Sequence, residues 1–558
     1  GPRDFPLARA WGMFRGMRAL LAWLCLASQV ATLFGADPGS KIVLVYAVTR
    51  HGTRNLLPKT VDALTDAPPR AAFGEVTLLP QGQRECYNAG RAFFQRYLNS
   101  STCRPADAAL PNTCLSPPVN PAAPDDELYG PINSPSGAAT WNNYNVLVMS
   151  SALDRTLLSA RSFTAGIFTN LNAPTDSHFL PDGSQPIPIY TSAGRDRDDV
   201  LIRAYNKCPA FTSTLQQWYS SAEFEEMSAA TATFRGHVSR LAGYSQAALN
   251  DLDAGDQDAF SLDNWYNVWD QFNTRNKTQG VYGNPMPNAG AMDVFRDDSV
   301  SLIPGTAGNT IPGTSLLGQI TWLAHWLETS KSSSALVGPL FGGPILSDLS
   351  DRMFTATSAF KLPQASSTAA FSPYAPTSTY ERLVIMSGHY NVQLGILAAL
   401  KMDEHILQNP SAAPSTPWVT VPGLSLTGVI PSAAAVLAFE LHQSANGGSY
   451  AVRAVLQNGP GKAGAPNAYS VVQLPCASAA GQAVAGPGAC TLADFQALID
   501  EPVRAAGNPS SWCAACQATD PLPCRVYSGA HRSRGGTGAA AFVVLLAAVL
   551  VHAAGRWW

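Results

Sequence analysis

Three apolar runs, each followed by a polar turn, dominate the distribution of hydrophobic positions along the chain. The runs are Lys41–Val48, Asn145–Ser150 and Arg382–His389, and helical patterns follow the second and third at 152–163 and 390–400. The runs are rich in β-branched residues and hardly alternate, as expected of strands buried on both faces of a parallel sheet. The pattern predicts an α/β protein with a doubly wound, mostly parallel sheet flanked by helices.

Other stretches show weaker patterns. Segments 104–139, 332–379 and 411–428 are rich in Pro, Ser, Ala and Gly, and we interpret them as surface insertions without packed elements. A helical pattern covers 223–244, and three aromatic residues follow it, Trp265, Tyr266 and Trp269. The aromatic residues could stack on a substrate, but their spacing is more typical of the packed face of a helix.

Basic residues follow the three predicted strands. Arg50, His51 and Arg54 follow the first, Arg155 the second and His389 the third. The carboxyl ends of parallel strands share one edge of a sheet, where such folds bind ligands, so we expect these side chains to meet. Three guanidiniums and two imidazoles suit a tetrahedral oxyanion, because each guanidinium can bond two phosphate oxygens at once. The sequence therefore predicts a phosphate site.

The histidine among the arginines has a second implication. Neighbouring positive charge lowers the pKa of His51, so the imidazole stays neutral in acid and can attack phosphorus to form a phosphohistidine. The alternatives are a solvated basic turn for residues 50–54, an ion pair of Arg155 with Asp154, and a structural role for His389 in the core.

The composition of the chain indicates that any anion-binding site is formed locally, by a few neighbouring residues. The chain has 558 residues, of which 46% are apolar and 13% charged, and its net charge is −3. This charge gives no general field for nucleic acid, and we expect none as a partner. We also expect no cofactor and no metal ion.

The first residues have the features of a secretory signal. Arg15 and Arg18 precede an apolar run at 19–26, and we assign 1–36 to a signal peptide, with a signal anchor as the alternative. Export agrees with ten cysteines, of which Cys103 with Cys114 and Cys476 with Cys490 are close enough in sequence to close local loops, and with the glycosylation sequons at Asn99 and Asn276. Nine cysteines remain after the signal, so one is expected to be left over.

The last part of the chain predicts a membrane anchor. Gly536–Ala554 is apolar and approaches the length of one bilayer crossing. Small residues at 528–530 and a polar spacer also fit a lipid-anchor signal, and a buried core helix is the third interpretation. We interpret 517–558 as a spacer and hydrophobic anchor, with the catalytic domain on the lumenal or extracellular side of the cell surface or of an endosomal or lysosomal membrane.

Three motifs carry a family resemblance. "RHGTR" at 50–54, "LDRTLLSA" at 153–160 and "SGH" at 387–389 resemble the histidine acid phosphatases, and further matches occur at 187–211 and from Cys490. The resemblance extends, with gaps, from about residue 41 to about residue 516. It implies an α/β core formed by 37–207 and 301–516, with a smaller, mainly helical cap at 208–300.

The resemblance also implies roles for individual residues. His51 is the expected nucleophile, and the expected phosphate ligands are Arg50, Arg54, Arg155 and His389. Cys208 is expected to pair with one of three late cysteines, Cys513, Cys516 or Cys524. In the family, an acidic residue after the second histidine protonates the leaving oxygen.

Tyr390 occupies the position of that acid in this chain. Tyr390 is therefore either a weak catalytic substitute or a packing residue. Two functions follow: an acid phosphomonoesterase acting through phosphohistidine and weakened at this position, or an inactive surface protein of the same fold that binds phosphorylated ligands.

Overall fold

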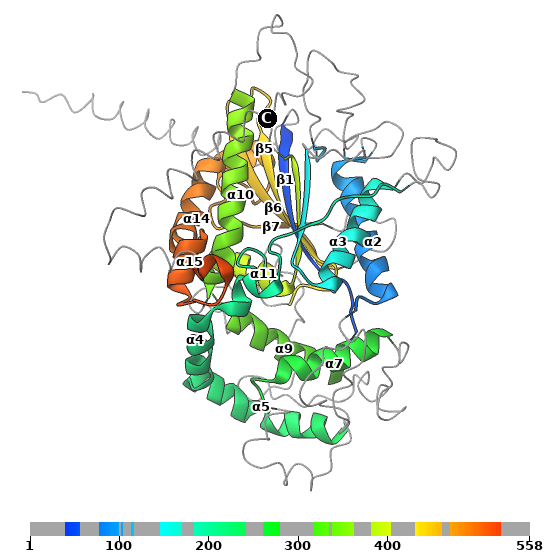
Figure 1. Cartoon of the computed structure of the whole chain (residues 1–558), viewed down its shortest axis with the longest axis vertical. Coiled ribbons are helices and arrows are strands. Elements are labelled where there is room, and N and C mark those ends of the chain that lie inside the picture. The colour runs from blue at the N-terminus through cyan, green and yellow to red at the C-terminus, as the bar shows by residue number, and fades with distance from the viewer. Residues whose placement is uncertain are drawn as a thin grey trace, which may run out of the picture.

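A mixed sheet between two layers of helices forms the core of the protein, and further helices lie beyond one end of the sheet (Figure 1). The computed structural model describes residues 40–55, 77–99, 102–103, 113–115, 145–169, 184–241, 261–278, 316–333, 337–361, 381–402, 430–459 and 469–525. The predicted signal peptide at 1–36, the insertion at 411–428 and the apolar segment at 536–554 lie outside these residues.

The sheet has mostly parallel strands, as the apolar runs predict. Its order is β3-β2-β4-β1-β5-β6-β7, and β8 pairs with β6. Strands β1 to β4 are mutually parallel, whereas β5 runs antiparallel to both of its neighbours. The strands are β1 (Lys41–Arg50), β2 (Val146–Ser150), β3 (Tyr190–Thr191), β4 (Leu383–Gly388), β5 (Val436–Gln443), β6 (Tyr450–Gln457), β7 (Ser470–Val472) and β8 (Cys490–Thr491).

Two helical layers cover the sheet. Val45 and Ala47 of β1 pack toward α2 (Pro80–Tyr97) and α3 (Asp154–Phe168). Leu44 and Tyr46 pack on the other face, toward α10 (Gly338–Lys361), α11 (Tyr390–Ala399) and α14 (Leu492–Ala506). Because β1 is buried on both faces, its apolar run lacks alternation, which confirms the fold class predicted from the sequence. Shorter helices complete the core: 3-10 helices η2 (Asp196–Asp198) and η3 (Ala204–Lys207), then α13 (Ala479–Ala485) and α15 (Pro509–Ala515).

Helix α10 corrects the interpretation of 332–379 as a surface insertion. Ile345, Leu349 and Met353 of this helix are buried in the core. The small residues that suggested a loop instead allow close helix packing. A Cβ at Gly342 would lie 2.4 Å from the carbonyl oxygen of Gly395 on α11, so only glycine permits this approach.

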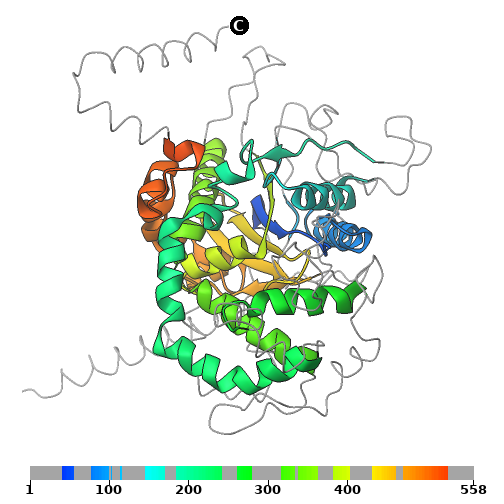
Figure 2. The same cartoon turned by 60° about the horizontal axis from the view of Figure 1, so that its bottom comes forward.

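Four helices beyond the carboxyl ends of the parallel strands share a separate apolar cluster (Figures 1 and 2). They are α4 (Pro209–Tyr219), α5 (Ala222–Leu241), α7 (Trp265–Thr278) and α9 (Leu316–Lys331). We call them the cap helices; α9 lies beyond residue 300, where the cap was predicted to end. Trp265 is fully buried, Trp269 is 5% exposed, and the Trp265 Nε1 donates to the Ile320 oxygen at 3.1 Å. The packed-face interpretation holds for these two residues.

Four disulfides link the described residues, and Cys86 is a free, buried cysteine. Cys103–Cys114 and Cys476–Cys490 close short loops as expected. Cys208 pairs with Cys516, one of its three expected partners, and Cys513 pairs with Cys524. The described helices include none with the length and apolar character of a membrane span.

A buried charged cluster lies near the amino end of β1, where Ile42 pairs with His442 of β5. At its centre is Glu440, which accepts hydrogen bonds from Arg96 at 2.7 Å and from Arg453 at 2.7 Å. His442 Nε2 lies 3.2 Å from the same carboxylate. Together the arginines lower the pKa of Glu440 well below its usual range even though burial acts in the opposite direction.

Candidate active site

The loop after β1 is fixed by backbone contacts on both sides. The His51 amide donates to the Gly388 oxygen of β4 at 3.0 Å, and the His51 oxygen accepts from the Ala434 amide at 3.2 Å. Gly52 packs against the first turn of α2, where a Cβ would lie 2.2 Å from the oxygen of Gly82. The glycine after the histidine is therefore a steric requirement of this turn.

His51 is buried and held in one tautomer. Its Nδ1 lies 2.8 Å from the Gly52 carbonyl oxygen, and since a carbonyl only accepts, Nδ1 carries the hydrogen. The pKa of His51 lies well below 6.5, because burial and then the charges of Arg50, Arg155 and Arg54 disfavour protonation. The neutral ring therefore carries its lone pair on Nε2, the state that a nucleophile requires.

Several guanidiniums near the two histidines have donors without partners. The buried Nε atoms of Arg50, Arg155 and Arg203 have no hydrogen-bond partner among the described residues. Burial and the charges of Arg54 and Arg203 lower the pKa of Arg155 to about 10, so it remains charged in acid. Unpaired buried donors are costly, and an oxyanion among these arginines would accept from them.

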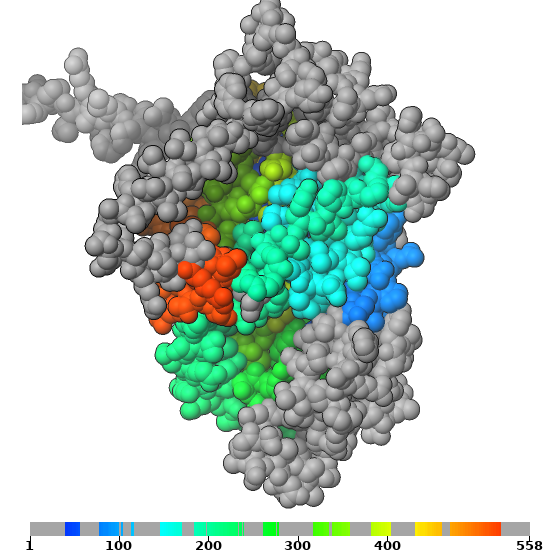
Figure 3. All heavy atoms as spheres, viewed as in Figure 1, coloured from blue at the N-terminus to red at the C-terminus, as the bar shows by residue number. Residues whose placement is uncertain are grey.

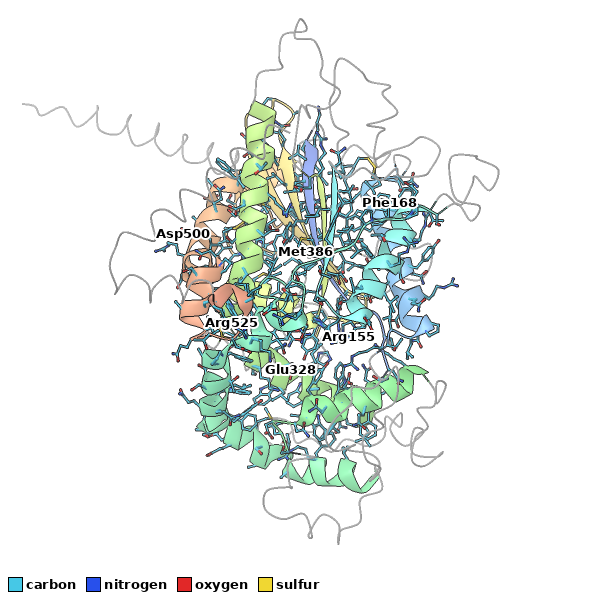
Figure 4. All side chains as sticks on the ribbon, viewed as in Figure 1. Arg155, Phe168, Glu328, Met386, Asp500 and Arg525 are labelled. Carbon is cyan, nitrogen blue, oxygen red and sulfur yellow. A yellow bond between two sulfur atoms is a disulfide. The ribbon has the colours of Figure 1, made fainter. Side chains whose placement is uncertain are left out.

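Arg203 is a cation that the sequence analysis did not single out. It belongs to the matched segment 187–211, pairs with Asp196 and lowers the pKa of His389. In Figure 3 residues 184–207, which include Arg203, lie between α3 and the C-terminal helices. Figure 4 shows Arg155 at the end of the sheet that is nearest the cap helices.

His389 lies beside His51, with ring centroids 5.3 Å apart. Its Nε2 is 3.3 Å from the Ser151 hydroxyl, which in turn lies 2.9 Å from the Thr156 hydroxyl. Burial, followed by the charge of His51 when protonated and those of nearby arginines, lowers the pKa of His389 well below 6.5. The turns after β1, β2 and β4 thus place His51 and His389 side by side and near Arg50, Arg54 and Arg155.

Arg54 is engaged by a cap residue. Its Nη2 donates to both carboxylate oxygens of Asp270 on α7 at 3.1 Å, and its Nη1 donates to the Asn55 oxygen at 3.0 Å. Only 6% of the Arg54 side chain and 8% of the Asp270 side chain are exposed. This buried ion pair joins the cap to the loop that carries His51.

Tyr390 is directed toward another cap residue. Its hydroxyl donates to Glu328 Oε2 on α9 at 2.6 Å, and Lys331 lies 2.9 Å from Glu328 Oε1. The Arg50 guanidinium lies over the Tyr390 ring at 4.9 Å, and the Tyr266 ring lies 5.4 Å away. Burial and the charge of Glu328 raise the pKa of Tyr390 well above 10. Glu328 lies on the cap side of the end of the sheet in Figure 4.

Asp270 and Glu328 could not be recognised as site residues from the motifs. Each stands among apolar and aromatic residues of its helix, in "NWYNVWDQF" and "WLAHWLETSK". The sequence offers one signal, a carboxylate within an apolar helical segment. Such a residue indicates a buried ion pair or hydrogen bond, because charged residues are rarely buried without a partner.

Comparison with known proteins gives a family and distant relatives. The sequence model of the histidine phosphatase superfamily (branch 2) matches residues 70–457, a range that includes Arg155 and His389 and begins after His51. Lysosomal acid phosphatase of Rattus norvegicus is 31% identical over 116 residues, and that of Xenopus laevis is 29% identical over 114. Each alignment covers 20% of this chain and 26% of the relative, about a quarter of its length.

Among solved structures, the apo form of Hafnia alvei phytase has a TM-score of 0.48 at 14% identity, covering 83% of this chain and 97% of that one. Citrobacter braakii phytase has a TM-score of 0.46 at 14% identity, with coverages of 83% and 97%.

Proposed function

Since the chain belongs to branch 2 of the histidine phosphatase superfamily, we propose that it is an acid phosphomonoesterase in which His51 is the nucleophile. One arrangement supports this proposal most: a buried, neutral imidazole with Nδ1 bonded to the Gly52 oxygen, surrounded by arginines. Arg50, Arg54 and Arg155 are proposed phosphate ligands together with His389.

The reaction has two displacements at phosphorus. The Nε2 lone pair of His51 forms a bond to phosphorus while the bond to the leaving oxygen breaks, and the oxygen departs with its electron pair. Water then attacks the phosphorus and gives a proton to the solvent, while the P–N bond breaks and its electron pair returns to Nε2, which releases inorganic phosphate and the free imidazole. The arginines stabilise the charge on the equatorial oxygens in both steps.

Acidic conditions suit this site because of its pKa shifts. His51 has a pKa well below 6.5 and therefore remains neutral in acid, where most solvent-exposed histidines are protonated. A phosphate anion next to His389 favours protonation of that ring, which then donates to the phosphate. The names of the two lysosomal acid phosphatases agree with activity in acid.

Trapping the covalent intermediate tests the nucleophile. During turnover of a labelled aryl phosphate, label is expected on His51; His51→Ala should abolish turnover, and His389→Ala should leave measurable activity. His442→Gln is a matched control, because this buried histidine lies at the opposite end of β1. Label on any other residue would refute the assignment.

The competing function is binding of phosphorylated ligands without catalysis. It is favoured by Tyr390 in place of the expected acid. Its signature would be phosphate binding that depends on Arg50 and Arg155, together with no hydrolysis of even an activated aryl phosphate.

We further propose that the protein enters the secretory pathway, because the described residues contain four disulfides and two relatives are named lysosomal. Glycosylation and the C-terminal anchor stay predictions. Deleting the residues after Ala530 should release the protein from membranes into the medium, and phospholipase release of the full chain would distinguish a lipid anchor from a spanning segment. Retention of the truncated chain on membranes would contradict a C-terminal anchor.

A further inference from the structure

The phenol of Tyr390 is poorly arranged to protonate a leaving group. Its hydrogen is directed to Glu328 Oε2 at 2.6 Å, and its side chain is buried between the core and α9. Loss of that proton would place a phenolate beside the Glu328 carboxylate. Burial and this repulsion raise the pKa of Tyr390 well above 10. In this structure Tyr390 instead supports Arg50, whose guanidinium lies over its ring.

The carboxylates that contact the site residues or shift their pKa values already accept hydrogen bonds from other groups. Glu328 accepts from Lys331 and Tyr390, and Asp270 accepts from Arg54 with both oxygens.

Two further carboxylates show the same pattern on the core side. Glu85 accepts from the amide and the hydroxyl of Thr53 at 2.7 and 2.8 Å. Asp196 accepts from Arg203 with one oxygen and from Asn206 with the other. A carboxylate that accepts at both oxygens has no hydrogen to give, so none of these four is arranged as a proton donor in the described part of the chain.

Aromatic rings adjoin the predicted phosphate site. The Tyr205 ring lies 6.2 Å from the ring of His389, and the Tyr266 ring lies 5.4 Å from that of Tyr390. Rings of this kind stack favourably against an aromatic group of a ligand.

We propose that this site selects aryl phosphates over alkyl phosphates, because an aryl oxygen departs from phosphorus without a proton donor and its ring can lie against the neighbouring tyrosines. The inference rests on the proposed function. When the P–O bond breaks, the phenolate leaves with the electron pair and takes its proton from water afterwards. An alkoxide lacks this route, and a positioned acid is typically worth about a hundred- to ten-thousandfold in rate.

The test compares kcat/KM for 4-nitrophenyl, phenyl and benzyl phosphate in acid. Benzyl phosphate is the matched control, since it keeps the ring but leaves as an alkoxide. We expect a steep fall along this series, with benzyl phosphate at least about a hundredfold below phenyl phosphate. Hydrolysis of benzyl and phenyl phosphate within about tenfold of each other would overturn this inference and leave the proposed function intact. If 4-nitrophenyl phosphate is not hydrolysed although inorganic phosphate binds, the proposed function fails, and this inference with it.

Two variants separate a proton donor from a supporting residue. Tyr390→Phe should lower hydrolysis of phenyl and benzyl phosphate by the same factor, because it removes the hydrogen bond to Glu328 and keeps the ring under Arg50. A selective loss with benzyl phosphate would identify the phenol as the donor and overturn the inference. Tyr390→Asp supplies a carboxyl group at this position and should raise the ratio of benzyl to phenyl hydrolysis. An unchanged ratio in a folded Tyr390→Asp protein would also count against it.

Discussion

Acid is expected to destabilise the unliganded protein through histidines that are buried in the neutral state, and His442 gives the clearest case. Burial is the main cause that lowers its pKa to about 4, and Arg453 and Arg96 act in the same direction. Glu440 acts in the opposite direction, but the two arginines already neutralise this carboxylate. His442 therefore gains little from taking a proton.

The sign and size follow from the difference between folded and unfolded chains. Between pH 6.5 and 4 the unfolded chain binds a proton at His442 that the folded chain does not. The contribution of neutral His442 to the free energy of unfolding is therefore complete above pH 6.5 and is lost as the pH falls toward 4. With these two pKa values, His442 removes about 2 kcal/mol near pH 5 and about 3 kcal/mol near pH 4, relative to neutral pH. His325, whose pKa is also lowered to about 4, acts in the same direction.

His442→Gln tests this reasoning, because glutamine keeps an N–H donor for Glu440 and does not titrate. Urea unfolding of both proteins at about pH 7 and about pH 5 gives the pH-dependent loss of stability for each. The variant should lose about 2 kcal/mol less than the native protein between these conditions. An equal loss in both proteins would mean that His442 is already protonated in the folded state, as an ion pair with Glu440, and would refute the argument.

Two further predictions concern the loop that carries His51. Asp270→Ala leaves Arg54 buried without its carboxylate and should reduce the free energy of unfolding by about 3–5 kcal/mol. Adding Arg54→Met to the same chain should restore part of this loss, because it removes the unpaired charge. If the two substitutions are fully additive in denaturation experiments, the ion pair is contradicted. Gly52→Ala should displace the loop from Gly82, so turnover and phosphate affinity should fall while the circular dichroism of the sheet and helices is kept; unchanged turnover would contradict the tight contact.

The sequence predicts the core of the site because its residues follow buried parallel strands. Continuous apolar runs identify β1, β2 and β4, and the topology of a doubly wound sheet then brings their turns to one edge. Arg50, His51, Arg155 and His389 could therefore be grouped without coordinates. The kind of ligand then follows from their charge, because clustered cations require an anion.

The contributions of the cap could not be predicted in this way. Asp270 is 216 positions from Arg54, and Glu328 is 62 positions from Tyr390, and no periodic pattern links either pair. Helix α10 was missed for a different reason. Its glycines are typical of loops in isolation, and only the close approach of Gly342 to α11 explains them.

The Cys208–Cys516 disulfide determines what a protease can release from this protein. It joins the first residues of the cap to the end of the core across 308 positions of sequence. A single cleavage anywhere between these cysteines leaves two fragments that are still covalently joined. A nicked protein would therefore migrate as one species until it is reduced, and only then separate into two pieces. Cleavage of the chain and loss of the cap are thus separate events, and an electrophoretic comparison with and without reductant can distinguish them.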